Sequence, residues 1–319
     1  MVLTGVVHDV GDLGGPAPWF VAVGKFDGIH RGHRAVLKAM LKAAAREGAR
    51  AAALTFEPHP MEVLRPGSLP PLLASREDRA RLLLETGVDP VVELKFDAAM
   101  AAVTAEAFVR DLAVRGHARR LYAGPDWRFG HRGAGTVELA REVGRPLGLD
   151  VVTLPVTLWH GVPISSSRIR EALLEGRVAH GREMLGRIYD VPGTVVHGKG
   201  RGAGIGFPTA NVEVSHRLVL PEAGVYAVRV QVEGTWRRAV ANLGVRPTFG
   251  SGGPQTLEAH IFDFAGDLYG AQVRVAFVSR LRGEHRFAGV EALRAQIAHD
   301  AERARAILAQ AERVKAHGG

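Results

Sequence analysis

Two histidines three residues apart, His30 and His33, follow a glycine-rich turn near the start of this 319-residue chain. Side chains at that spacing share one face of a helix entrance, so both imidazoles can reach the same ligand. Each ring can donate an N–H to a phosphate oxygen. Residues 21–33 read as an apolar strand, a glycine turn and a helix start, which presents backbone N–H groups and the positive helix end to an anion. The pattern predicts a site for a nucleoside triphosphate.

The turn is neither a Walker A loop nor the Gly-x-Gly-x-x-Gly of dinucleotide binders. An isolated His-x-x-His pair is more often structural than catalytic. The full string Gly24-Lys-Phe-Asp-Gly-Ile-His-Arg-Gly-His33 is far more specific. It resembles the signature of the nucleotidylyltransferase superfamily in the form used by bacterial FAD synthetases. The resemblance implies catalytic roles for His30 and His33 and ATP contacts from Gly24, Phe26, Asp27 and Gly32.

Three serines and two arginines form a second candidate group, Ile164-Ser-Ser-Ser-Arg-Ile-Arg170. Ser165 or Ser166 is a plausible helix N-cap, which is the commoner role of such a residue. The hydroxyls, the guanidinium groups and the helix N-terminus would also cradle phosphate. The segment resembles the Ile-Ser-Ser-Thr-x-Ile-Arg element of the same family, with a serine in place of the threonine. The implied ATP ligands are Ser165, Ser166, Ser167, Arg168 and Arg170.

The segment Gly124-Pro-Asp-Trp-Arg-Phe-Gly130 resembles a third element of this family, Gly-x-Asp-Phe-x-Phe-Gly. Trp127 stands where phenylalanine is usual. The resemblance implies that Asp126 contacts the nucleotide and that Phe129 contacts flavin.

The second half of the chain has its own glycine-rich stretch, residues 197–206, followed by Phe207-Pro-Thr-Ala-Asn211. Glycines alone would indicate a linker, but the block that follows resembles the riboflavin kinase signature Gly-Phe-Pro-Thr-Ala-Asn. Ala203 departs from that family's usual arginine. The resemblance implies Mg²⁺ binding by Thr209 and Asn211, whose hard oxygens suit this ion. It also implies phosphate binding by Gly198, Lys199, Gly200, Arg201, Gly206 and Pro208.

Four later segments resemble the same kinase family in the expected order: 224–226, 242–249, 257–264 and 281–287. A glutamate on a solvated strand face is usually inert, but the resemblance places the general base at Glu258. It also implies flavin contacts from Tyr226, Asn242, Arg246, Arg282 and Phe287.

The elements that must position these residues fall into two patterns. Up to residue 154, strands at 19–23, 51–56, 91–94, 121–123 and 151–154 alternate with helices, which predicts a parallel sheet covered on both faces, with ligands at the carboxyl ends of the strands. From residue 193 short strands at even spacing predict a small β-barrel or sandwich, and residues 290–315 predict a long helix. We therefore expect an α/β class protein with a Rossmann-like nucleotidylyltransferase domain over 1–186 and a β-barrel riboflavin kinase domain over 187–319.

Composition limits the alternatives. The net charge of +8 and the isoelectric point near 10.2 raise the possibility of nucleic-acid binding, but the arginines are interleaved with glutamates, and polyanionic small substrates fit equally well. The chain has no cysteine, no signal pattern and no apolar run of membrane-spanning length. We expect a cytoplasmic enzyme, a monomer or weak homo-oligomer, that binds neither nucleic acid nor membrane.

The two resemblances together imply a bifunctional enzyme that uses ATP and Mg²⁺ to convert riboflavin to FMN and then FMN to FAD. Two alternatives stay open. One is a protein whose adenylylating half is degenerate, which the intact His30/His33 pair disfavours. The other is a nucleic-acid-binding protein on the same fold, which the missing aromatic-basic strand pattern disfavours.

Overall fold

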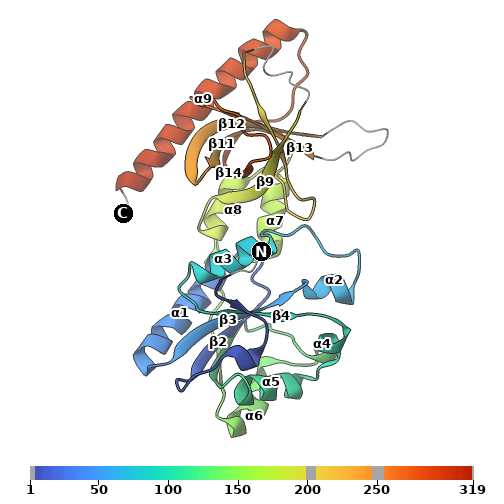
Figure 1. Ribbon diagram of the computed structural model, residues 1–319, viewed down its shortest axis with the longest axis vertical. Coiled ribbons are helices and arrows are strands. Elements are labelled where there is room, and N and C mark those ends of the chain that lie inside the picture. Colours follow the sequence, from blue (N-terminus) through green and yellow to red (C-terminus); the bar gives the residue numbers. More distant parts are fainter. Residues whose placement is uncertain (1–3, 199–205, 246–254, 318–319) are drawn as a thin grey trace. The chain divides into compact units, whose positions relative to one another are not determined.

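The structure is a computed structural model that describes residues 4–198, 206–245 and 255–317 (Figure 1). The chain divides into two compact units, residues 1–166 and 167–319. Each unit is considered by itself below. The domain boundary near residue 186 stays a prediction.

The N-terminal unit is built on a six-stranded parallel sheet with the strand order β1-β4-β3-β2-β5-β6, which confirms the predicted class. The chain moves from β2 toward one edge of the sheet and then returns to β5 on the other side. The crevice at this reversal, between β2 and β5, is where ligands bind in such sheets. The strands are β1 (Val6–Val7), β2 (Trp19–Val23), β3 (Arg50–Glu57), β4 (Val91–Lys95), β5 (Ala118–Ala123) and β6 (Asp150–Thr153).

Helices cover both faces of this sheet, so its central strand β2 is apolar throughout. In β2, Phe20 and Ala22 pack on one side with α1 (Arg31–Glu47) and α3 (Arg76–Leu84). Val21 and Val23 pack on the other side with α5 (Ala105–Val114) and α6 (Val137–Gly144) (Figure 1). Two of these helices have side-chain N-caps: Ser75 and Thr136 accept hydrogen bonds from the first turns of α3 and α6.

Several short elements of this unit have no counterpart in the sequence-based expectation. Prolines at 58 and 60 disfavour regular structure, yet α2 (Pro60–Leu64) begins at the second of them, because proline is tolerated in the first turn of a helix. The helix α4 (Ala98–Ala102) and the hairpin of β7 (Leu158–Trp159) and β8 (Val162–Pro163) are each too short to give a periodic signal.

The C-terminal unit is a closed six-stranded barrel with the order β10-β13-β12-β11-β14-β9, so the predicted small barrel is confirmed. All of its strand pairs are antiparallel. The strands are β9 (Tyr189–Val196), β10 (Ala210–Glu213), β11 (Gly224–Val232), β12 (Thr235–Val245), β13 (Gln255–Ile261) and β14 (Gln272–Arg282). Two helices, α7 (Ser166–Leu174) and α8 (Val178–Leu185), precede the barrel.

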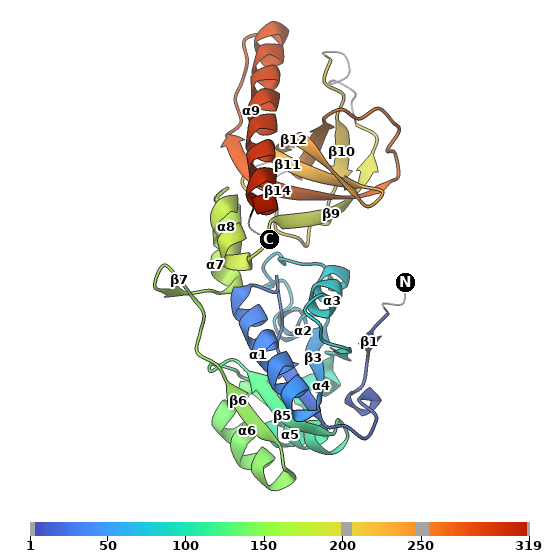
Figure 2. The same ribbon diagram turned by 90° about the vertical axis from the view of Figure 1, so that its left-hand side faces the viewer.

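The long helix α9 (Val290–His317) runs along the outside of the barrel (Figure 2). Ala301, Ala304 and Leu308 are buried against outward-facing side chains such as Val240 and Val278. The helix is fixed further by Arg305, whose guanidinium group donates to both carboxylate oxygens of Asp263 at 2.8 and 3.1 Å. This packing also brings the earlier turns of α9 over the barrel wall.

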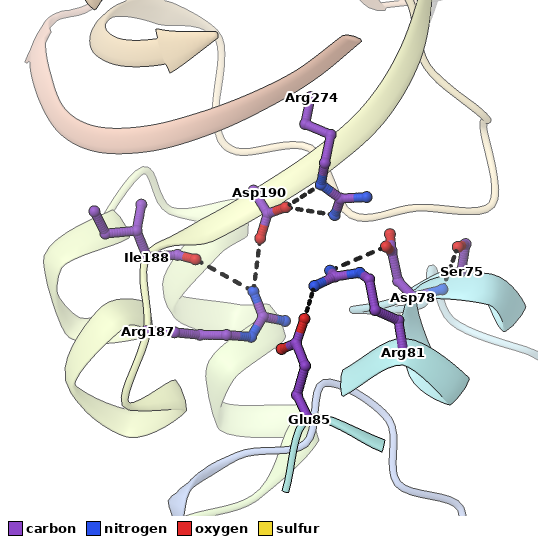
Figure 3. A network of polar contacts seen from close by, with 8 residues as sticks. All are labelled: Ser75, Asp78, Arg81, Glu85, Arg187, Ile188, Asp190 and Arg274. Carbon is purple, nitrogen blue, oxygen red and sulfur yellow. Dashed lines mark hydrogen bonds and ion pairs between the residues drawn. The ribbon is translucent and has the colours of Figure 1, made fainter. Parts of the chain in front are cut away.

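Ion pairs stabilise the start of β9 in the C-terminal unit and the helix α3 in the N-terminal unit (Figure 3). Asp190 at the start of β9 accepts hydrogen bonds from Arg187 at 2.8 Å and from Arg274 of β14 at 2.7 Å. This fixes the first residues of β9 beside its barrel neighbour. On α3, Arg81 pairs with Asp78 at 3.2 Å and with Glu85 at 2.5 Å. Such partly exposed pairs each contribute at most about 1 kcal/mol.

Candidate functional site

The turn after β2 has an unusual backbone that presents the histidines. Phe26 and Ile29 adopt left-handed φ angles of 50° and 41°, although neither is glycine. Both side chains are buried, so the core holds them in a conformation that costs free energy. The Phe26 ring lies edge-on to His33, with ring centroids 5.2 Å apart. The strand end, the turn and the start of α1 thus form one rigid frame.

His30 and His33 stack on each other, with ring centroids 3.7 Å apart and an interplanar angle of 16°. His30 is the N-cap of α1, and its Nδ1 accepts a hydrogen bond from the His33 backbone N–H at 3.3 Å. Burial lowers the pKa of His30 to about 4. Burial, and then the proximity of His30, lower the pKa of His33 well below its ordinary value. At neutral pH both rings are therefore uncharged, and the proton of His30 is on Nε2, which is left to donate to a ligand.

This burial predicts acid sensitivity. The folded pKa of His30 is depressed, so its contribution to stability is present above the unfolded pKa of 6.5 and is lost as pH falls toward about 4. This difference between the folded and unfolded pKa values of His30 corresponds to about 3 kcal/mol of folding free energy. The lowered pKa of His33 changes the stability in the same direction. We expect the unfolding free energy of the ligand-free protein, measured by urea denaturation, to fall between pH 7 and pH 4.5. The His30→Asn variant keeps a good N-cap but has no titrating group at this position, so its unfolding free energy should fall less between these pH values. An equal fall in the variant and the parent protein would contradict this explanation.

The segment 165–166 reaches the histidine turn. Ser166 Oγ donates to the backbone carbonyl of Asp27 at 2.9 Å. The Asp27 carboxylate is buried and accepts from the Leu73 backbone N–H at 2.8 Å, so it holds the turn in place. Three further residues of the predicted serine–arginine group lie in the second compact unit, and their placement against the histidines stays a prediction: Ser167, Arg168 and Arg170.

A pocket of about 730 Å³ opens beside this turn, within the range of roughly 300–1,000 Å³ that is typical of small-molecule sites. Gly24 lines it, and so does Phe129, the predicted flavin contact of this half. The Trp127 and Phe129 rings stack at 3.9 Å with an interplanar angle of 9°, so the replacement of phenylalanine by Trp127 leaves a flat aromatic wall. Asp126 is exposed and is not among the lining residues.

Sequence reasoning missed much of this lining. The chain from β3 into α2 supplies Phe56, Pro60, Met61 and Leu64. Between them His59 is buried, and its Nδ1 accepts from the Met61 backbone N–H at 3.1 Å. The sequence Phe56-Glu-Pro-His-Pro60 could have indicated this. Two prolines around a histidine restrict the backbone directly after a strand, and ligands bind at the carboxyl ends of the strands in a parallel sheet. The lining also includes Lys25, Arg65, Phe96, Met100, Ala101, Val103, Phe108, Arg128, Gly130, Arg132 and Gly133.

In the second unit three barrel strands bring the predicted polar residues together. Glu258 of β13 lies directly opposite Asn211 of β10 on one side and Asn242 of β12 on the other. Residues opposite one another on adjacent strands share a face, with Cβ atoms about 5 Å apart. Thr209, one residue before β10, lines the same pocket as Glu258 and Asn242. A carboxylate is thus placed between two amides.

This second pocket has a volume of about 380 Å³ and is closed on one side by the first turns of α9. Arg282 donates through Nε to the buried Asp300 at 2.9 Å and lies over the Phe287 ring at 5.6 Å. Gln296 donates to the other Asp300 oxygen at 3.0 Å. Three of the predicted flavin contacts line the pocket: Asn242, Arg282 and Phe287. The remaining lining residues are Phe207, Val225, Val240, Ala241, His260, Glu284, His285, Leu293, Ile297 and Asp300.

Tyr226, predicted to contact flavin, lies elsewhere. It follows Val225, which lines the pocket, and successive residues of a strand point to opposite faces. Its side chain is fully buried, and its hydroxyl donates to the Glu222 carbonyl. Burial raises the pKa of Tyr226 to about 12, so the hydroxyl stays protonated.

The predicted phosphate loop is described only at its ends. Gly198 approaches Asn211 so closely that a Cβ would lie 2.0 Å from the amide nitrogen. The Pro208 carbonyl accepts from His260 Nδ1 at 2.8 Å, and Gly206 has a φ of 86°. Other predicted residues lie outside the described part of the chain: Lys199, Gly200, Arg201, Ala203 and Arg246.

Comparison with known proteins agrees with this geometry. Residues 16–168 match the family model described as FAD synthetase, and residues 185–308 match the model described as riboflavin kinase. No helix within residues 4–317, as far as they are described, is long and apolar enough to cross a membrane.

Similar proteins extend over nearly the whole chain. A bifunctional riboflavin kinase/FMN adenylyltransferase of Escherichia coli is 40% identical over 88% of this chain and 90% of its own length. The protein of that name from Listeria monocytogenes is 35% identical over 92% and 93%. A crystal structure from Streptococcus pneumoniae, described as a macrolide-efflux protein, is 33% identical with a TM-score of 0.87 over 95% of this chain and 99% of its own. The chain belongs to the family of bifunctional riboflavin kinases/FMN adenylyltransferases.

Proposed function

We propose that Glu258 is the general base of riboflavin phosphorylation and that the His30/His33 pair holds the ATP phosphates during adenylylation of FMN. Membership of the family gives this chain both activities, the conversion of riboflavin to FMN and of FMN to FAD. The observation that supports this division of roles is the contrast between the two sites. One has a carboxylate flanked by amides on the barrel wall, and the other has two uncharged imidazoles at a helix N-terminus.

Phosphorylation needs a base because the attacking 5′-hydroxyl of riboflavin must lose its proton as the new P–O bond forms. The Glu258 carboxylate faces the pocket and can accept that proton. Thr209 and Asn211 would hold Mg²⁺ together with ATP phosphate oxygens, since a hydroxyl and an amide oxygen are hard, uncharged ligands. The metal ion would neutralise phosphate charge there.

Adenylylation needs no base because the attacking FMN phosphate is already ionised. The site must instead neutralise charge and align the phosphate with the α-phosphorus of ATP. His30 Nε2–H, the N-terminus of the 17-residue helix α1 and the Ser166 region would supply donors to the triphosphate. Ser167, Arg168 and Arg170 would add a hydroxyl and positive charge.

Gly198→Ala tests the kinase site without touching its base. The new Cβ would meet the Asn211 amide at 2.0 Å, so the amide must leave its place beside Glu258. We expect FMN formation to fall about tenfold or more, as for loss of one positioned ligand, while FAD formation from FMN continues. Gly234→Ala, in the β11–β12 turn of the same barrel and outside the predicted site, is the control, because no atom of the described residues lies within 4 Å of its added Cβ; its left-handed φ makes only a modest loss of stability expected. Equal activity of Gly198→Ala and the parent protein would refute the role of Asn211.

Incubation of the full chain with riboflavin and Mg-ATP tests the whole proposal. Chromatography over time should show FMN rising first and FAD following, and omission of Mg²⁺ should stop the first step. We also propose a domain boundary near residue 186, close to the start of the riboflavin kinase match at residue 185. We propose a cytoplasmic monomer or weak homo-oligomer without nucleic-acid or membrane partners, to be checked by light scattering and filter binding.

A further inference from the structure

The pocket of the N-terminal unit combines aromatic walls with a cationic rim. Its walls include the stacked pair Trp127 and Phe129. None of the described residues that line it carries a carboxylate. Four lining side chains are cationic, and we call them the cationic rim: Lys25, Arg65, Arg128 and Arg132.

The backbone under two of these arginines is firmly fixed. Arg132 has a left-handed φ of 53°, and its loop is fastened by the neighbouring His131. The His131 backbone N–H donates to the Val103 carbonyl at 2.7 Å, and its Nδ1 donates to the Ala101 carbonyl at 3.1 Å. Arg65 ends α2, and its carbonyl accepts from the Ser68 N–H at 3.0 Å and from the Ser68 hydroxyl at 2.6 Å. The backbone from which each of these two pocket-lining side chains extends is therefore held in place.

The barrel pocket has the opposite electrostatic character. Among its described lining residues are three carboxylates, Glu258, Glu284 and Asp300. Its one described guanidinium group, Arg282, forms an ion pair with Asp300 at 2.8 Å. The two pockets would bind the same ring system, but riboflavin is neutral whereas FMN carries a phosphate with nearly two negative charges.

We propose that the cationic rim makes the N-terminal pocket selective for a flavin that carries a phosphate, with Arg65 and Arg132 as specificity-determining residues. The inference rests on the proposed adenylylation of FMN by this unit, and it places the flavin ring in the pocket that the predicted flavin contact Phe129 lines. The aromatic walls should bind all flavins with similar affinity, because stacking involves the flavin ring and does not depend on whether the ribityl chain ends in a phosphate. The rim adds charge-assisted contacts only when a phosphate is present.

The test compares a charged flavin with a neutral one at the same site. FMN is the substrate, and lumiflavin, which has no ribityl chain and cannot be phosphorylated, is the competitive inhibitor. At saturating ATP, Arg65→Gln and Arg132→Asn should each raise the KM for FMN about tenfold and leave the Ki of lumiflavin unchanged. Asparagine is chosen at 132 because it tolerates a left-handed backbone. Arg110→Gln is the control, since Arg110 is exposed on α5 and is not a lining residue; it should change neither constant.

Trp127→Ala separates failure of this inference from failure of the pocket assignment. If the pocket holds flavin, this variant raises both the KM for FMN and the Ki of lumiflavin. If Trp127→Ala raises both constants while neither arginine variant changes the KM for FMN, selection by the rim is refuted and the pocket assignment stands. A Trp127→Ala variant that changes neither constant overturns the assignment and the inference with it. An arginine variant that raises both constants equally also refutes selection.

Discussion

Glu258→Gln is expected to remove riboflavin phosphorylation, with a fall in kcat of about 10²–10⁴-fold, the usual worth of a general base. Glutamine has the shape of glutamate but cannot accept the proton of the 5′-hydroxyl. Its position between Asn211 and Asn242 allows the new amide to hydrogen-bond, so the barrel should fold normally. The measurement is the rate of FMN formation from riboflavin and Mg-ATP, followed by chromatography.

The same variant protein should still convert added FMN to FAD at the parent rate, because that reaction requires no base. Glu213→Gln is the matched control. Glu213 lies two residues after Asn211 on the same strand and outside the pocket lining, so this change removes an equal charge and should leave both reactions intact. Loss of both reactions in folded Glu258→Gln, or retention of FMN formation, would show that the two sites do not divide the work as proposed.

His30→Ala is expected to give the reverse result, a fall of about 10²–10³-fold in FAD formation from FMN, as for removal of one positioned hydrogen-bond donor. Riboflavin phosphorylation should continue. The reason is that the buried, uncharged ring presents its Nε2–H to the triphosphate while Nδ1 is used by the helix.

Because His30 also caps α1, the alanine variant loses about 1 kcal/mol of stability as well. His30→Asn separates the two roles, since asparagine is a preferred N-cap but does not place a donor where the imidazole Nε2 lies. We expect His30→Asn to melt close to the parent protein and to be almost as inactive as His30→Ala. An asparagine variant with full activity would mean that His30 serves the helix and not the reaction.

Local features of the fold could be predicted from sequence because their causes are local. The helix entrance at His30, the caps at Ser75 and Thr136 and the alternation along β13 each depend on residues a few positions apart. The register that places Asn211 and Asn242 beside Glu258 depends on pairing between distant strands, and only the family resemblance hinted at it.

The pockets were harder to predict for a physical reason. The pocket of the N-terminal unit draws its walls from segments that begin near residues 24, 56, 96 and 127, and single apolar residues such as Phe96 carry no signal of a cavity. Tyr226 stays a prediction as a flavin contact, although its ring is buried against Phe277. A motif gives residue types at a spacing, whereas the packing decides which side each one faces.

Different parts of the helix α9 line the barrel pocket and pack the helix against the barrel. Leu293 and Ile297 line the barrel pocket, whereas Ala304 and Leu308, about two to four turns later, pack the helix against the barrel. Removal of the carboxyl-terminal residues up to and including Leu308 would leave Leu293 and Ile297 in the chain. It would still loosen the side of the pocket that these two residues form, because the helix would lose part of its packing on the barrel. Such a shortened protein would be expected to need more riboflavin for the same rate while its strands stayed intact, and affinity tags are better placed at the other terminus.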